Sequence, residues 1–130
     1  MFIDTSAVVA ILAEEPDTAE LLDRMAGAPA RLTSALVIPE AVMRLSTKLA
    51  IDSLMIEPLV ERFMREAGID LAPMDANAAR FAVKAFADCG KGRGHPAQLN
   101  LADCLSYGCA KAQGVPLLYK GDDFARTDLA

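Results

Sequence analysis

The sequence predicts an α/β domain built on a parallel β-sheet, and two observations support this prediction. Short apolar runs rich in Ile, Val and Leu alternate with longer stretches whose apolar residues recur at helical spacing, which is typical of strands joined by helices. The chain has 130 residues, the size of one compact domain, and shows no repeat or linker. We therefore expect residues 1–130 to form a single domain with about four to five strands.

The first half of the chain is predicted to contain two strands and three helices. The expected elements are a strand over residues 1–6, a helix over 17–27, a strand over 30–38, and helices over 39–51 and 56–68. Asp17 and Glu20 have the spacing of a helix capping box, and Gly27 ends the same helix. Pro39 is well placed in the first turn of the next helix.

The second half continues the alternation. The expected elements are a strand over residues 69–74, a helix over 75–90, a loop over 90–98, a helix starting near Asn100, and a strand over 115–120. Asp75 is expected to cap the first of these helices, and Gly90 to end it. The loop contains three glycines and a proline in nine residues, which makes a regular element there costly.

Composition argues against several classes of protein. The formal net charge is −5, so a phosphate-containing partner needs either a local basic patch or bound cations. The three cysteines form no CxxC pair, which favours free thiols in a reducing compartment over a zinc site. No uncharged run exceeds nine residues, whereas a membrane span needs about 18–20, and the N-terminus lacks the basic start of a signal peptide. We expect a soluble, cytoplasmic protein.

Acidic residues occur where predicted strands end or where the following helices begin. Asp4 interrupts the apolar start "MFIDTSAVVAIL", Glu40 lies in the first turn after the second strand, and Asp103 lies in the first turn of the helix after the loop. Asp122 and Asp123 follow the last strand. Ligands of open α/β sheets bind where the carboxyl ends of the strands converge, so these carboxylates are expected to meet.

Such a group of carboxylates predicts a site for divalent cations. Carboxylates within about 4–6 Å of one another repel, which raises their pKa values and destabilises the fold unless a cation such as Mg²⁺ or Mn²⁺ neutralises them. Four carboxylates balance two divalent ions, an arrangement that holds a phosphodiester and activates water for attack on phosphorus. This chemistry needs no His, Ser or Cys nucleophile, and the single histidine, His95, has no obvious triad partner.

Structural interpretations of the same residues stay open. Asp103 could form a helix cap with Asn100, and Glu40 could form an ion pair with Arg44. Asp122 and Asp123 could start a turn after Gly121, and Asp4 could bind backbone groups of Thr5 or Ser6.

Four motifs in order carry a family resemblance: "FIDTSA", Glu40 in "IPEAVMR", "LNLADC" and "PLLYKGDDFARTDL". Together they resemble the PIN-domain ribonucleases, specifically the VapC toxins of bacterial toxin–antitoxin pairs, over nearly the whole chain. The glycine- and lysine-containing loop before "LNLADC" adds to the resemblance. It implies an α/β/α sandwich, an acidic pocket for Mg²⁺ or Mn²⁺, endonucleolytic cleavage of RNA, a homodimer and inhibition by a VapB-type antitoxin.

The resemblance also implies roles for single residues. Asp4 and Asp103 match the principal metal ligands, and Glu40 matches the second acidic position. Asp123 is the expected fourth, because the first acidic place of "GDDF" often holds Asn in similar toxins; Asp122 is its substitute.

Two supporting roles accompany these ligands. Thr5 or Ser6 would orient a metal-bound water. Lys91, Arg93 and His95 lie in the loop before the third acidic residue and are candidates for binding RNA phosphates, the alternative being ordinary solubilising charge.

The apolar middle of the chain exceeds what two short helices need. Most of it is expected in the core, and any remainder could form a dimer face or a groove for an antitoxin helix. The residues are Leu54, Met55, Leu59, Phe63 and Met64.

Two other functions compete with the nuclease. One is an aspartyl-phosphotransfer or phosphatase domain, with Asp75 as phosphoacceptor and Lys120 after the last strand. The other is a catalytically silent PIN-like domain kept for binding, which the presence of all four acidic positions disfavours.

Overall fold

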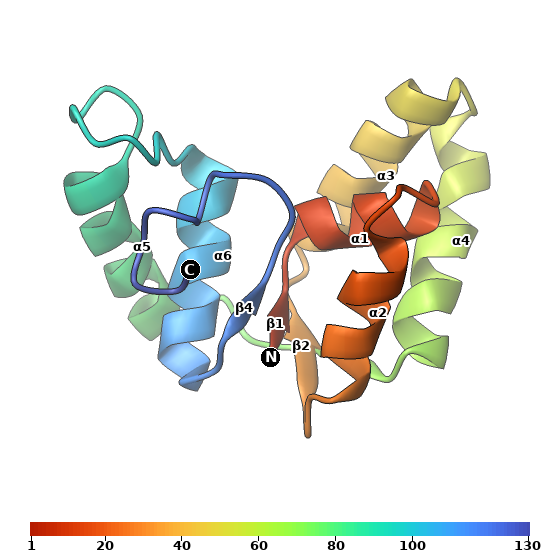
Figure 1. The fold of residues 1–130 in the computed structure, drawn as a ribbon, viewed down its shortest axis with the longest axis horizontal. Helices are drawn as coiled ribbons and strands as arrows, with labels where there is room; N and C mark the ends of the chain where they lie inside the picture. The colour runs from red at the N-terminus through yellow and green to blue at the C-terminus, as the bar shows by residue number, and fades with distance from the viewer.

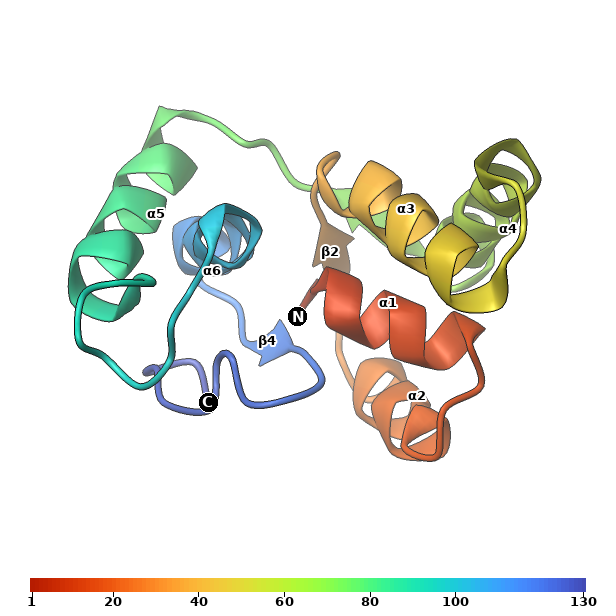
Figure 2. The same ribbon diagram turned by 90° about the horizontal axis from the view of Figure 1, so that it is seen from above.

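The computed structural model describes all 130 residues, which form a four-stranded parallel sheet and six helices. The strands are β1 (Phe2–Ile3), β2 (Arg31–Thr33), β3 (Ile69–Leu71) and β4 (Leu117–Leu118). The helices are α1 (Thr5–Leu12), α2 (Thr18–Ala26), α3 (Val37–Leu49), α4 (Ser53–Glu66), α5 (Ala76–Cys89) and α6 (Leu101–Gln113). Helices α1 to α4 lie to one side of the sheet and α5 and α6 to the other (Figures 1 and 2), so the predicted fold class is confirmed.

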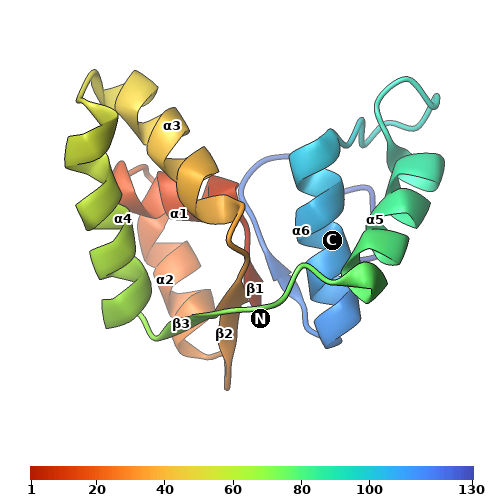
Figure 3. The same cartoon turned by 180° about the vertical axis from the view of Figure 1, so that it is seen from behind.

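The strand order is β3-β2-β1-β4, and all neighbouring strands are parallel. Seen from behind, β3, β2 and β1 follow one another in this order (Figure 3). Phe2 of β1 lies opposite Leu32 of β2 and Leu117 of β4, so the first strand occupies an inner position with a neighbour on each side. The Asp4 backbone N–H donates to the Leu118 carbonyl at 2.9 Å. The carboxyl ends of the first and last strands are therefore adjacent.

The predicted strand over residues 1–6 is wrong beyond Ile3, because α1 begins at Thr5. Six of the eight residues of α1 are buried, so the segment shows neither the alternation of a half-buried strand nor the apolar stripe of a surface helix. A helix buried on most sides gives one continuous apolar run without helical periodicity, so no helix was predicted between residues 6 and 17.

Several other boundaries differ from the prediction. The last two strands are shorter than expected, because β3 ends at Leu71 instead of residue 74 and β4 covers only Leu117–Leu118 instead of 115–120. The second strand ends at Thr33 instead of residue 38, and α3 begins at Val37, ahead of Pro39. Helix α4 begins at Ser53 rather than residue 56, because the Asp52 carboxylate caps it by accepting from the Leu54 N–H at 2.8 Å.

Helices α5 and α6 pack closely, and this packing positions the first turn of α6. A Cβ added at Gly108 would lie 2.4 Å from the Ala78 carbonyl oxygen and 2.9 Å from the Ala82 nitrogen, so only glycine permits this approach. The predicted caps of both helices, Asp75 and Asn100, are confirmed. No helix combines the length and apolar character needed to cross a bilayer.

Candidate active site

Asp4 caps the N-terminus of α1. Its backbone is extended, and its Oδ2 accepts from the Ser6 N–H at 2.9 Å and from the Ser6 hydroxyl at 2.6 Å. The carboxylate is 5 % exposed, and the positive end of the helix dipole together with these donors stabilises its charge. The predicted hydrogen bond from a nearby backbone group to Asp4 is therefore formed, and Ser6 is its donor. The other carboxylate oxygen, Oδ1, receives no hydrogen bond from the protein.

Glu40 is held by a neighbour from another helix. Its Oε2 accepts from the Thr5 hydroxyl at 2.7 Å, and Thr5 is 1 % exposed. The proposed ion pair between Glu40 and Arg44 is not formed, because Arg44 has no carboxylate oxygen within 4.0 Å. A buried threonine therefore ties the first turn of α3 to the first turn of α1.

Asp103 takes part in a capping box at the start of α6. The Asn100 side chain accepts from the Asp103 N–H, and the Asp103 Oδ2 accepts from the Asn100 N–H, both at 2.9 Å. Burial is the largest cause that raises the pKa of Asp103 to about 6, and the charges of Asp123, Asp4 and Glu40 act in the same direction, against the hydrogen bond from Asn100. The capping interpretation of Asp103 is thus correct, and the predicted rise in pKa is found at Asp103.

The fourth acidic position lies in the exposed segment after β4. Buried Phe124 anchors this segment and packs edge to face against Tyr119, with ring centroids 5.3 Å apart. Asp122 and Asp123 both line the open cleft beside it. Only Asp123 is among the charges that raise the pKa of Asp103, which favours Asp123 over Asp122 as the fourth residue.

The charges of Asp4, Glu40 and Asp123 act on Asp103, but no three His, Cys, Asp or Glu side chains are placed to hold a metal ion. Asp4, Glu40 and Asp103 each have one carboxylate oxygen that accepts a hydrogen bond from a neighbouring residue and the other without a protein donor. Carboxylate oxygens are the ligands that hard cations such as Mg²⁺ and Mn²⁺ prefer. The chemistry of these oxygen donors, and the negative charges that act on Asp103, fit a divalent cation.

Comparison with known proteins identifies the family. The family model described as PIN domain matches residues 1–129. The chain belongs to the PIN-domain family. The resemblance inferred from the four motifs is therefore confirmed at the level of the family.

Similar proteins cover this PIN domain from end to end. Ribonuclease VapC42 of Mycobacterium tuberculosis is 40% identical over 129 residues, which are 99% of this chain and 96% of the relative. Ribonuclease VapC28 of the same species is 42% identical over 127 residues, with 98% of this chain and 93% of the relative covered. VapC ribonuclease Mb0640 of Mycobacterium bovis is 41% identical over 133 residues, with coverage of 100% and 96%.

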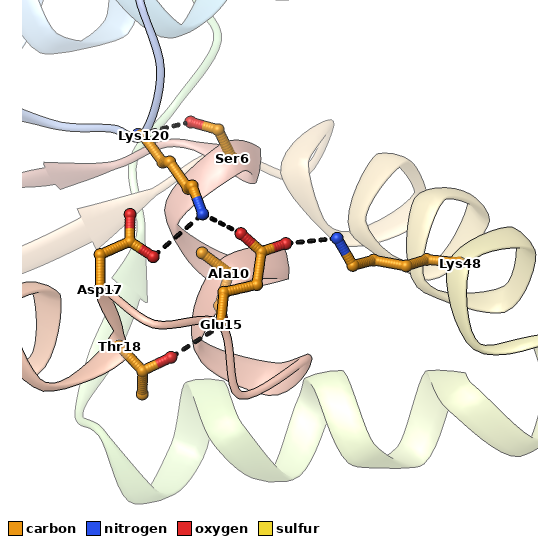
Figure 4. A network of polar contacts seen from close by, with 7 residues as sticks. All are labelled: Ser6, Ala10, Glu15, Asp17, Thr18, Lys48 and Lys120. Carbon is orange, nitrogen blue, oxygen red and sulfur yellow. Dashed lines mark hydrogen bonds and ion pairs between the residues drawn. The ribbon is translucent and has the colours of Figure 1, made fainter.

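Beside the acidic residues, this PIN domain has an ionic network that was not foreseen (Figure 4). Lys120 binds the carboxylates of Glu15 and of Asp17, the latter at 3.0 Å, and Lys48 of α3 binds the other oxygen of Glu15. Hydrogen bonds from Lys120 and Lys48 hold the pKa of Glu15 below its ordinary value. The Lys120 backbone N–H also donates to the Ser6 hydroxyl at 3.0 Å.

This network corrects the role predicted for Asp17. Its carboxylate makes no capping hydrogen bond to α2 and binds Lys120 instead, although the spacing to Glu20 fits a capping box. Lys120 lies 103 residues further along the chain, so local spacing gave no sign of the pair.

The loop with the three predicted RNA-binding residues leads directly into the first turn of α6 (Figure 1). The Arg93 guanidinium lies 4.8 Å from the centre of the Phe86 ring. His95 is half-buried; its Nδ1 accepts from the Ala97 N–H at 3.1 Å, and its Nε2 lies 3.9 Å from the Cys89 Sγ. Lys91 is exposed.

The geometry does not support aspartyl phosphotransfer. Asp75 caps α5 by accepting from the Ala78 N–H at 3.0 Å. It follows β3, which is two places from β1 in the sheet, and Lys120 is already bound to two carboxylates.

Proposed function

We propose that residues 1–130 act as a single PIN domain that cuts RNA with divalent metal ions, as the toxin of a VapBC-type toxin–antitoxin pair. The observation that carries the proposal is geometric: Asp4, Glu40 and Asp103 lie at the starts of three helices, each with one carboxylate oxygen bound by a neighbour and the other without a protein donor. The charges of Asp4, Glu40 and Asp123 also raise the pKa of Asp103. Relatives named VapC ribonucleases over nearly the full length support the RNA substrate and the endonucleolytic activity.

In this proposal Asp4, Glu40, Asp103 and Asp123 hold Mg²⁺ or Mn²⁺, with Asp122 as a substitute for Asp123. When bound, the cations would supply charge to offset the carboxylates and the scissile phosphate, and would make an attacking water more acidic. The chain's own contribution is orientation, which Ser6 gives to Asp4 and Thr5 gives to Glu40.

Binding of the substrate is assigned in part to Lys91, Arg93 and His95. Lys91 and Arg93 are exposed cations on a loop that ends at the first turn of α6, so their charges are available to RNA phosphates. His95 is turned into the loop and is better placed to hold its shape.

The partner surface is assigned to α4. The prediction that most of the apolar middle lies in the core is wrong. Of its five residues only Met64 is buried and Phe63 is half-buried, whereas Leu54, Met55 and Leu59 are 76%, 67% and 51% exposed. The core-facing side of α4 is formed by Ile56, Val60 and Met64. A groove of about 270 Å³ is lined by residues of α4, α3 and the end of α1. Its apolar lining residues are Leu12, Leu45, Leu49, Ile56, Leu59 and Phe63. We propose that such surfaces serve a VapB-type antitoxin and a homodimer in the cytoplasm, where free cysteines are stable.

A catalytically silent binding module is the second candidate. It is favoured by one observation, the absence of three carboxylates already placed to hold a metal ion. A silent module and a nuclease differ in metal-dependent cleavage.

The test compares cleavage of total RNA with Mn²⁺, with Mg²⁺ and with EDTA. We expect cleavage with the metals only, and a loss of at least about a hundredfold in Asp4→Asn and in Asp103→Asn, because each removes a negative ligand. Asp23→Asn, an exposed carboxylate of α2 without an ion pair, is the matched control and should cleave like the wild type. Equal cleavage by Asp4→Asn and the control would contradict the assignment, and no cleavage by the wild type would favour the silent module.

A further inference from the structure

An open cleft of about 860 Å³ adjoins the acidic residues. One wall comes from α3, the opposite wall from the segment after β4, and the floor from α1. The residues of α3 that line it are Met43, Arg44, Thr47 and Lys48; those of the opposite wall are Lys120, Gly121, Asp122 and Asp123. Ser6, which binds Asp4, is part of the floor. The cleft therefore leads to the candidate metal ligands.

The cations of this cleft are not equivalent. Lys48 and Lys120 both bind Glu15, and Lys120 also binds Asp17, so their charges are offset within the protein. Arg44 is exposed, and no carboxylate oxygen lies within 4.0 Å of its guanidinium. It is the one cation in the cleft whose charge is not used by the protein itself.

The position of Arg44 relates it to the acidic residues. It follows Glu40 by four residues on α3, which places the two side chains on the same face, about 6 Å apart along the helix axis. The phosphates of an RNA strand are negative, and so are the carboxylates of the site and the protein as a whole, whose net charge is −5. The strand therefore needs positive charge on the protein outside the metal site. A guanidinium is suited to this, because it binds phosphate oxygens through two parallel hydrogen bonds.

We propose that Arg44 binds a phosphate of the RNA strand next to the scissile one, and that the cleft beside α3 is the path of that strand. This inference rests on the proposed function, since it concerns the substrate of the same site. It makes Arg44 a positioning residue whose contribution is to affinity and register.

The experiment measures binding of a short 5′-labelled single-stranded RNA of mixed sequence by fluorescence anisotropy in EDTA, over a series of salt concentrations. Arg44→Gln should bind about tenfold more weakly, and its plot of log affinity against log salt should be shallower by about 0.7, the value for one lost phosphate contact on a single strand. Arg44→Lys should keep the wild-type slope, because the charge remains. All variants should keep the wild-type melting temperature, because residue 44 is exposed.

The control is Arg80→Gln. Arg80 is also exposed, lies on α5 across the sheet from α3, and has no carboxylate partner. A wild-type slope in Arg44→Gln, or an equal change in Arg80→Gln, would overturn the inference. The proposed function is judged separately by metal-dependent cleavage. If the protein cuts RNA but the salt dependence of RNA binding is the same in Arg44→Gln as in the wild type, only the inference about Arg44 is refuted. If RNA binding depends on Arg44 but the protein cuts no RNA, only the nuclease activity is refuted.

Discussion

At the scale of the residue, each principal carboxylate is oriented by a single neighbour. Ser6 holds Asp4, Thr5 holds Glu40, and Asn100 holds Asp103. The first and third arrangements are local, so the sequence motifs indicated them. The contact between Thr5 and Glu40 joins residues 35 positions apart and could not be deduced from spacing.

Thr5→Val tests this long-range contact. Valine has the shape of threonine but lacks the hydroxyl, so Glu40 loses its orienting donor; we expect Mn²⁺ to bind about tenfold more weakly in isothermal titration. The free energy of unfolding should fall by about 1 kcal/mol, the usual value for one hydrogen bond. Thr5→Ser restores the hydroxyl and should recover most of the Mn²⁺ affinity. Unchanged Mn²⁺ binding in Thr5→Val would remove Thr5 from the site.

Asp103 gives the metal-free protein a specific pH dependence. Burial and neighbouring charges raise its pKa from 3.8 to about 6, so between these values the folded state binds more protons than the unfolded chain. Stability therefore falls as the pH rises through this range. The loss should be about 1 kcal/mol, allowing for solvent screening of a half-buried group. Urea unfolding near pH 4 and pH 7 measures it.

Asp103→Asn should abolish that part of the pH dependence, because an amide does not titrate, and its Oδ1 can still accept from the Asn100 N–H. Asp23→Asn on the exposed face of α2 should leave it unchanged. If the free energy of unfolding depends on pH in both variants as it does in the wild type, the raised pKa of Asp103 does not affect stability.

At the scale of the element, prediction succeeded where caps and periodicity agreed. Helix α5 was found from Asp75 and Gly90, and the start of α6 from Asn100. Helix α1 was missed because burial on most sides removes the polar residues that reveal helical periodicity. The N-terminal cap of α4 at Asp52 was overlooked, so the helix was placed three residues too late.

Gly108→Ala tests the close packing of α5 against α6. The added Cβ would meet the Ala78 carbonyl oxygen at 2.4 Å, a backbone atom that cannot turn away, so we expect a loss of about 1–3 kcal/mol in unfolding by urea. Gly27→Ala is the matched control, because its nearest atoms would lie at 3.8 Å, and it should be neutral or slightly stabilising. Equal effects of the two substitutions would show that α5 and α6 can move apart freely.

At the scale of the whole molecule, the parallel sheet determines which segments meet. The rule that ligands bind at the carboxyl ends of strands predicts that Asp4 and Asp123 lie close together, because they follow the neighbouring strands β1 and β4. Asp103 begins α6, which follows α5 and a loop instead of a strand, so this rule alone does not place it. The link from Lys120 to Glu15 and Asp17 joins opposite ends of the chain and depends on the strand order, which the sequence did not provide.

Metal binding should stabilise the molecule as a whole by mass action. A ligand at a hundred times its Kd adds about 2.7 kcal/mol to the free energy of unfolding, so the Tm should rise steadily with Mn²⁺ concentration. Asp4→Asn and Asp103→Asn should flatten this rise, and Asp23→Asn should not. If the Tm of the wild type did not change with Mn²⁺ concentration, metal binding to the folded state would be contradicted.

The place of β4 beside β1 also links the sheet to the acidic residues. Leu117 and Leu118 supply one neighbour of the first strand, and Asp123 follows them. A chain in which β4 has separated from β1 therefore leaves the first strand open on that side and moves Asp123 away from Asp4, so opening of this one strand pair would dismantle the candidate site before the rest of the fold is lost.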